Sequence, residues 1–173
     1  YERIDASEGR IVVVSSLGYK MGLQTIQFDD MNWDANYHQN RTYCHSKLAQ
    51  MMFAYELQDR VEAAGGRVEV YVCHPGSSRT SLIETSGNFV SKLAFRLMAL
   101  SPMVQSAERG AYPEVMCATE RGLAQRALYG PTGFMEMVGP VGQGTLEPYA
   151  YDKAVLTELW AVSEAATGFT WAL

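Results

Sequence analysis

The sequence is poor in cysteine, in basic residues and in long apolar runs. Its three cysteines form no C-x-x-C pair, which argues against a disulfide framework or a zinc site and favours a reducing compartment, the cytoplasm. No run approaches the roughly 20 apolar residues of a membrane-spanning helix, so we expect no membrane span. Acidic residues outnumber basic ones by 19 to 14, which argues against nucleic acid as a partner.

The sequence does have enough apolar residues for a core. Hydrophobic residues make up 47% of 173 positions, which excludes a disordered chain and suits one domain. The chain begins at Tyr1 rather than with a methionine and has no signal-peptide pattern. We therefore expect it to begin inside a domain.

A βαβ unit is predicted in the first half of the chain. The β-branched run Arg10–Ser16 lies between Gly9 and Gly18 and predicts a strand that is buried on both faces. Apolar residues at helical spacing predict a helix over Thr42–Ala64, and Arg67–His74 predicts a second strand. Strand, helix and strand in this order favour a parallel crossover and an α/β fold.

The remaining segments carry weaker signals. The polar, aperiodic excursion Leu17–Asn40 is long for a connection, and long connections are usually functional. Helices are predicted over Asn88–Leu100, Ser106–Thr119 and Tyr151–Thr167. Between the last two, Leu128–Gly144 predicts one short strand and turns, of which Gly139–Gly144 is interpreted as a loop.

Chemistry-bearing residues follow both strands of the βαβ unit. Ser16 ends the first strand, Pro75–Gly76 ends the second, and Tyr43 and Lys47 lie one turn apart on the helix between them. Ligands of α/β sheets bind beyond the carboxyl ends of parallel strands. An ammonium favours a nearby phenolate, so Tyr43 can exchange a proton with a carbonyl or alcohol oxygen that Ser16 holds. This arrangement predicts assistance to hydride transfer from a nicotinamide, with Ser15 as a structural residue.

Other residues of the same types are interpreted as structural. A second Tyr-x-x-x-Lys, at Tyr149–Lys153, follows Pro148 and has no upstream strand that ends in serine, so we take it as accidental. His45 and His74 have no partners at metal-ligand spacing. We expect both to be packed or solvated, and we expect no metal site. Cys44 is interpreted as a buried thiol rather than a reactive one.

The three motifs, in this order, closely resemble the short-chain dehydrogenase/reductase family. They are Gly9–Ser16, Tyr43-x-x-Ser46-Lys47-Leu48-Ala49 and Cys73-His74-Pro75-Gly76-x-x-x-Thr80. Within the excursion, Ile26–Trp33 resembles the retinol-dehydrogenase-like branch, which is associated with bulky apolar carbonyls and alcohols.

The resemblance implies a Rossmann-like doubly wound parallel sheet and an NAD(P)-dependent oxidoreductase that interconverts a carbonyl and an alcohol. The implied catalytic residues are Ser16, Tyr43 and Lys47, with Tyr43 as acid/base. The implied cofactor-binding residues are Tyr43, Lys47, Pro75, Gly76, Ser78 and Thr80. The cofactor is NADP or NAD, and the substrate is expected to be a small apolar carbonyl or alcohol. The apolar stretch Phe89–Met98 is either a core helix or a lid over that substrate.

Two features of the family precede its catalytic serine, the glycine-rich phosphate turn and an Asn-Ala-Gly motif, and only 15 residues precede Ser16. We therefore expect residues 1–173 to be the C-terminal catalytic portion of a single Rossmann-type domain. The N-terminal strands and the N-terminal cofactor-binding half are then absent from this chain, and the first strand presents an unpaired sheet edge. The missing N-terminal segment is the expected partner, and a homodimer is an expected assembly. The alternative is a catalytically silent fragment or binding domain.

Overall fold

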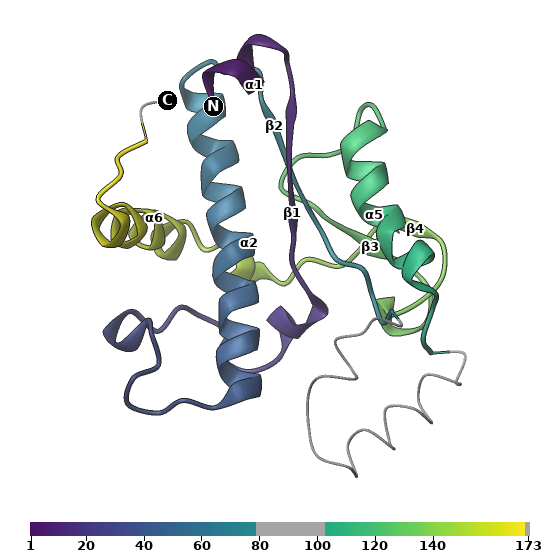
Figure 1. The fold of residues 1–173 in the computed structure, drawn as a ribbon, viewed down its shortest axis with the longest axis horizontal. Helices are drawn as coiled ribbons and strands as arrows, with labels where there is room; N and C mark the ends of the chain where they lie inside the picture. Colours follow the sequence, from purple (N-terminus) through teal and green to yellow (C-terminus); the bar gives the residue numbers. More distant parts are fainter. Residues whose placement is uncertain (79–102, 172–173) are drawn as a thin grey trace.

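The computed structural model describes residues 1–78 and 103–171, which form a sheet with helices on both faces (Figure 1). The strands, in their order across the sheet, are β1 (Arg10–Val14), β2 (Glu69–Cys73), β3 (Leu128–Pro131) and β4 (Val141–Gln143). The helices are α1 (Glu2–Ala6), α2 (Gln39–Ala63), α5 (Ala107–Thr119) and α6 (Lys153–Thr167). Short 3-10 turns are η1 (Leu17–Lys20), η2 (Phe28–Asp30), η3 (Phe134–Glu136) and η4 (Pro148–Tyr151). The first three strands are parallel, and β4 is antiparallel to β3.

The predicted βαβ unit is confirmed. Strands β1 and β2 pair in parallel, with Val14 opposite Cys73, and α2 is the crossover between them. The helix begins three residues earlier than the sequence predicts, because the His38 side chain accepts a hydrogen bond from the Arg41 amide and caps the end. It stops before Gly65, which has the left-handed φ of +70°.

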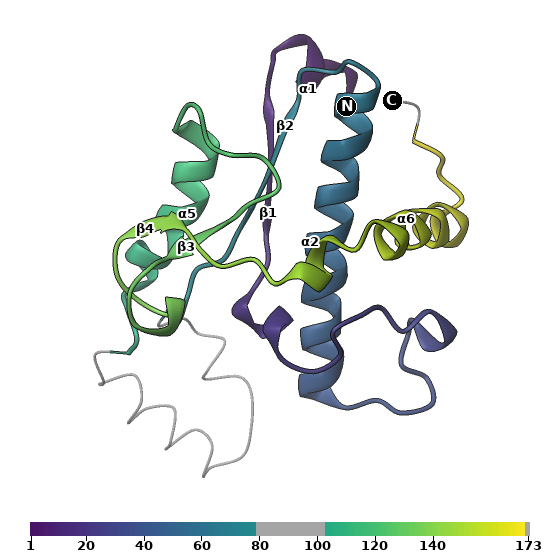
Figure 2. The same ribbon diagram turned by 180° about the vertical axis from the view of Figure 1, so that it is seen from behind.

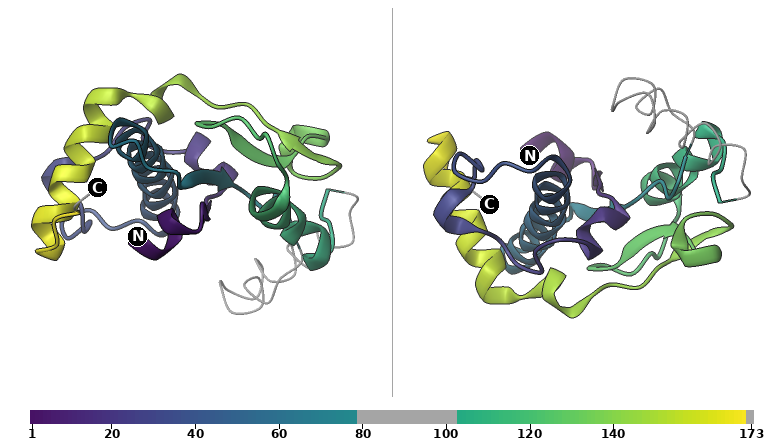
Figure 3. Two further views of the ribbon diagram at one scale, coloured as in Figure 1. Left: turned by 90° about the horizontal axis from the view of Figure 1, so that it is seen from above. Right: turned by 90° about the horizontal axis from the view of Figure 1, so that it is seen from below.

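Alternating side chains of β2 separate two helical layers. Val70 and Val72 belong to the core that α2 and α6 share, whereas Tyr71 and Cys73 pack with Cys117 of α5. Figures 1 and 2 show α5 and α6 on opposite sides of α2 and β1. Seen along its axis, α2 lies between the sheet and α6 (Figure 3). This arrangement confirms the Rossmann-like α/β prediction.

Three local predictions are corrected. The first strand ends at Val14 and is half-buried along its length rather than buried on both faces, because β2 is its only strand neighbour among the described residues. The segment Gly139–Gly144 contains β4 rather than a plain loop, since β3 offers it an edge. The last helix begins at Lys153, where the Asp152 carboxylate accepts amide hydrogens of the first turn.

The remaining helix predictions have different outcomes. The helix predicted over Ser106–Thr119 is confirmed as α5, and the Ser106 hydroxyl caps it by accepting a hydrogen bond from the Arg109 amide. The helix predicted over Asn88–Leu100, with the stretch Phe89–Met98, lies outside the described residues. Within the described part, no helix combines the length and the apolar content that a bilayer crossing requires.

A charged cluster joins α6 and the start of β3 to α2. The Asp59 carboxylate accepts hydrogen bonds from Arg126, Tyr151 and Lys153, the last at 2.6 Å. Burial by itself would raise the pKa of Asp59, but these donors outweigh it and hold the pKa below its usual value. Asp59 is therefore the acceptor at which three segments that are far apart in sequence meet.

Replacing Asp59 with alanine should destabilise the fold by about 2 kcal/mol, because two cations and a phenol lose their shared acceptor. The control is Glu62→Ala, since Glu62 also pairs with Arg126 but is 65% exposed. This change should cost less than about 1 kcal/mol. Urea unfolding of both variants measures the difference, and equal losses would show that the Asp59 cluster has no special weight.

Candidate active site

Two hydrogen bonds tie the end of β1 to the first turns of α2. The Ser15 hydroxyl, which is buried, donates to the Lys47 carbonyl at 2.9 Å. In the opposite direction, the Lys47 ammonium donates to the Val14 carbonyl at 3.2 Å. Ser15 thus has the structural contact that the sequence analysis expected of it, and it places the helix start at the strand end.

The next residues bring Ser16 and Tyr43 together around a glycine. The Ser16 hydroxyl accepts a hydrogen bond from the Gly18 amide at 3.1 Å. A Cβ at Gly18 would lie 3.1 Å from Cε1 of Tyr43 and 3.4 Å from Oγ of Ser16. Both side chains therefore lie against the bare backbone of Gly18, while the Tyr43 side chain keeps an exposed fraction of 45%. A phenol in this position can reach a ligand that enters from solvent.

The Lys47 ammonium lies one turn after Tyr43. Besides the Val14 carbonyl, it donates to the Gln50 side chain at 3.0 Å. An ammonium has three donors, so in the described part of the chain one N–H of Lys47 is left for a ligand hydroxyl.

The Pro75–Gly76 turn follows β2, beside the end of β1. Gly76 has a φ of +63°, and a side chain there would collide with the Met137 carbonyl. The same carbonyl accepts the Ser77 amide hydrogen at 2.8 Å. The Ser78 hydroxyl donates to the Pro75 carbonyl at 2.9 Å, so its proton is engaged in a hydrogen bond within the turn.

The structure thus places Ser16, Tyr43, Lys47 and the Pro75–Gly76 turn at neighbouring strand ends. Thr80, the remaining cofactor-binding residue that the resemblance implies, lies outside the described residues.

Sequence reasoning did not find an ion pair at the same edge of the sheet. The Lys20 ammonium lies 2.6 Å from Glu136, which also accepts the Thr145 amide hydrogen. Burial would raise the pKa of Glu136, but Lys20 and Thr145 hold it below its usual value. Met135 and Glu136 both have a positive φ, which is uncommon for non-glycine residues. Because the partners are distant in sequence, no local pattern signals this contact.

The residues that were interpreted as structural have packed partners. Cys44 is buried, and burial raises the pKa of its thiol, which disfavours a reactive thiolate. Burial also lowers the pKa of His45. Over residues 1–78 and 103–171, no group of three metal-ligating side chains gathers. In the second Tyr-x-x-x-Lys, the Tyr149 hydroxyl donates to the Tyr19 carbonyl, and Lys153 pairs with Asp59.

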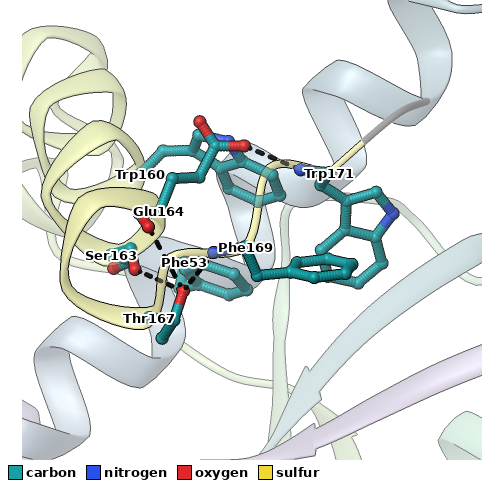
Figure 4. Close-up of a pocket in the computed structure, with 7 residues that line it drawn as sticks. All are labelled: Phe53, Trp160, Ser163, Glu164, Thr167, Phe169 and Trp171. Carbon is teal, nitrogen blue, oxygen red and sulfur yellow. Dashed lines mark hydrogen bonds between the residues drawn. The ribbon is translucent and has the colours of Figure 1, made fainter.

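An apolar pocket of about 340 Å³ lies away from this site, between α2, α6 and the C-terminal residues (Figure 4). Its lining residues are Phe53, Trp160, Ser163, Glu164, Thr167, Phe169 and Trp171. Phe53 follows Tyr43 by ten residues, which is about 15 Å along a helix. The Trp171 ring also contacts the Tyr1 ring, at 6.2 Å between centroids. The pocket therefore borders the two ends of the chain rather than the strand ends.

Comparison with known proteins places retinol dehydrogenases among the relatives of this chain. It is 32% identical to Retinol dehydrogenase 12 of Homo sapiens over 98% of its length and 34% identical to Retinol dehydrogenase 14 of Homo sapiens over 94%. It covers 49% and 45% of those proteins, so it spans about half of their length. No protein-family model matches.

The structure is similar to the crystal structure of an uncharacterized protein from Mycobacterium paratuberculosis. The TM-score is 0.73 at 28% sequence identity, over 95% of this chain and 52% of the other.

His74 should make stability depend on pH. It is buried beside the active-site turn, and burial lowers its pKa to about 4, against about 6.5 in an unfolded chain. Because the folded pKa is the lower one, the unfolded chain binds the extra proton between these values. Stability is therefore complete above pH 6.5 and falls as the pH drops toward 4, by about 3 kcal/mol from this group.

Replacing His74 with asparagine should remove that loss, because the amide keeps an acceptor for the Gly76 amide but does not titrate. The control is His38→Asn at the exposed start of α2, which should lose stability as the unmodified protein does. Urea unfolding at pH 7 and pH 4.5 measures the differences. An equal loss in His74→Asn and in the unmodified protein would contradict the assignment.

Proposed function

Since the chain belongs to the short-chain dehydrogenase/reductase family, we propose that it forms the catalytic part of an NAD(P)-dependent oxidoreductase that interconverts a carbonyl and an alcohol. One observation carries this proposal. Ser16 and Tyr43 lie against the same glycine, and Lys47 is bound to Val14, the last residue of β1. A silent binding domain has no need of this arrangement, so that alternative is not favoured.

Each of the three residues has a proposed role at the substrate oxygen. Tyr43 gives its phenolic proton to a carbonyl oxygen in reduction and takes the proton from an alcohol in oxidation. Ser16 donates a hydrogen bond that holds the same oxygen, and Lys47 stabilises the phenolate by its charge. Contacts at the end of β1 hold these three side chains in place before a substrate binds. Such preorganisation favours efficient proton transfer.

The residues at the strand ends suit the nicotinamide end of a dinucleotide. The free N–H of Lys47 can bind a ribose hydroxyl. Gly76 packs against the Met137 carbonyl, which holds the Pro75–Gly76 turn at the end of β2. When bound, the cofactor supplies or accepts the hydride. The choice between NAD and NADP is left open, because the residues that select between them follow a strand of the family's other half.

The proposed substrate is apolar and bulky rather than small, in line with the branch that Ile26–Trp33 resembles. Relatives of this chain are named for retinol, a long apolar alcohol. Phe134 and Met135 support an apolar substrate, since they follow β3 beside the Pro75–Gly76 turn and are 59% and 70% exposed. The homodimer and the cytoplasmic location stay predictions.

Replacing Tyr43 with phenylalanine in the full-length protein should lower kcat by about 100-fold or more, because the proton donor is lost. The assay follows nicotinamide absorbance during reduction of all-trans-retinal and of decanal, with NADH and NADPH in turn. The matched control is Tyr149→Phe, which removes the hydroxyl of the second Tyr-x-x-x-Lys and should leave kcat unchanged. Retained activity in Tyr43→Phe would refute the role of this residue.

Replacing Gly18 with alanine tests whether contact with the bare backbone positions Tyr43. The new methyl group would lie 3.1 Å from the ring and should push it away from the substrate oxygen. A displacement of this kind lowers kcat by about 10-fold or more. The control is Gly142→Ala in β4, where the Cβ would also lie 3.1 Å from a side chain, that of Thr132. If the two variants have equal kcat values, Gly18 does not position Tyr43.

A further inference from the structure

Trp33, three residues after η2, has a backbone conformation that bulky residues rarely adopt. Its φ is +59°, in the left-handed region, although its side chain is almost fully buried. A non-glycine residue in this region is strained and persists only where its surroundings hold it. Such strain is concentrated at functional sites, and so the contacts that hold Trp33 are informative.

His45 is the residue that holds Trp33. The indole N–H of Trp33 points at Nδ1 of His45, 3.2 Å away, and the two rings meet edge to face at 5.5 Å. On the other side of the imidazole, the Gln27 amide points at Nε2 at 3.0 Å. A neutral imidazole accepts at only one nitrogen, so the two donors compete for it.

The position of His45 connects this contact to the proposed active site. It lies two residues after Tyr43, on α2, and is 3% exposed. The segment that it holds belongs to Leu17–Asn40, which begins after Ser16 and runs into the helix that carries Tyr43. Ile26, in the same segment, is also buried in the core beside α2.

Of the charged groups near the contact, Arg41 of α2 lies against the same ring, whereas Asp30 is engaged elsewhere. The Arg41 guanidinium lies over the Trp33 ring at 5.8 Å, and the Asp30 carboxylate accepts the amide hydrogens of Asp34 and Ala35. The imidazole is therefore the hydrogen-bond acceptor that α2 offers to the Trp33 indole, beside the Arg41 contact with the ring face.

We propose that His45 is a positioning residue of the active site, which holds the segment between Ser16 and Tyr43 in its working conformation through Nδ1 and the indole of Trp33. This inference rests on the proposed function. This contact holds the segment between Ser16 and Tyr43 against α2 in one conformation. Lys47 is held separately, by Ser15 and Val14. Loss of the contact should therefore lower kcat and leave the KM for the cofactor unchanged.

Three substitutions of His45 test the proposal in the full-length protein. His45→Phe removes both ring nitrogens and should lower kcat by about 10- to 100-fold, which is the usual effect of a misplaced group. His45→Asn puts an amide oxygen near the place of Nδ1 and should restore most of that loss. His45→Gln puts it near the place of Nε2, toward the Gln27 amide, and should not. Rescue by glutamine rather than asparagine would overturn the role of Trp33.

Trp33→Phe removes the indole N–H but keeps an aromatic ring, and it covers the case in which His45→Phe does not fold. It should reproduce the fall in kcat with an unchanged KM for the cofactor. Unchanged kcat in Trp33→Phe and in any folded His45→Phe would overturn the proposal. A loss of kcat that His45→Asn does not restore would also overturn it.

Limited trypsin digestion separates this proposal from the proposed function. Cleavage after Lys20 and Arg41 should be faster in His45→Phe and Trp33→Phe than in the unmodified protein and in His45→Asn. If the unmodified protein reduces no carbonyl, the proposed function fails, while the cleavage rates still show whether His45 holds the segment. Equal cleavage rates in all four proteins would overturn the proposal that His45 holds the segment.

Discussion

The paired hydrogen bonds between the end of β1 and the start of α2 are the constraint on which the site depends. The Ser15 hydroxyl donates to the helix backbone, and the Lys47 side chain donates to the strand backbone. The Ser15 hydroxyl is buried, where an unpaired polar group is costly. Because the two bonds run in opposite directions, the strand end and the helix start are held at one relative position. Ser16 and Tyr43 then meet at Gly18 without a direct bond between them.

The helix α2 has three roles, and its burial reflects them. One side packs on Val70 and Val72 of the sheet, and another packs on α6 through residues such as Trp160. Its first turns carry the candidate catalytic side chains, and its last turns carry Asp59. A helix buried between two layers has no single polar face, and so its apolar residues do not form one clean stripe. The same helix therefore stabilises the fold and positions the residues of the candidate site.

Much of the fold was predictable because its signals are local. The β-branched run in β1, the glycine after α2 and the serine before α5 each determine a nearby boundary. The wrong predictions concern which strands lie next to one another in the sheet, rather than the propensity of a segment to form a strand or a helix. The burial of β1 depends on which strands lie beside it, and β4 forms because β3 offers a partner edge. The candidate site was predictable to the extent that its residues follow strands or share a helix turn.

By itself, the sequence determined the parallel βαβ unit, the residues at its strand ends and the one-turn spacing of Tyr43 and Lys47, since each depends on residues close together in the chain. Only the tertiary structure decided how the long excursion is held. His45 meets Trp33 across a segment with no periodic pattern, and Lys20 meets Glu136 across more than a hundred residues. Such contacts form when packing excludes water from both partners, and no local pattern of residue types encodes that proximity.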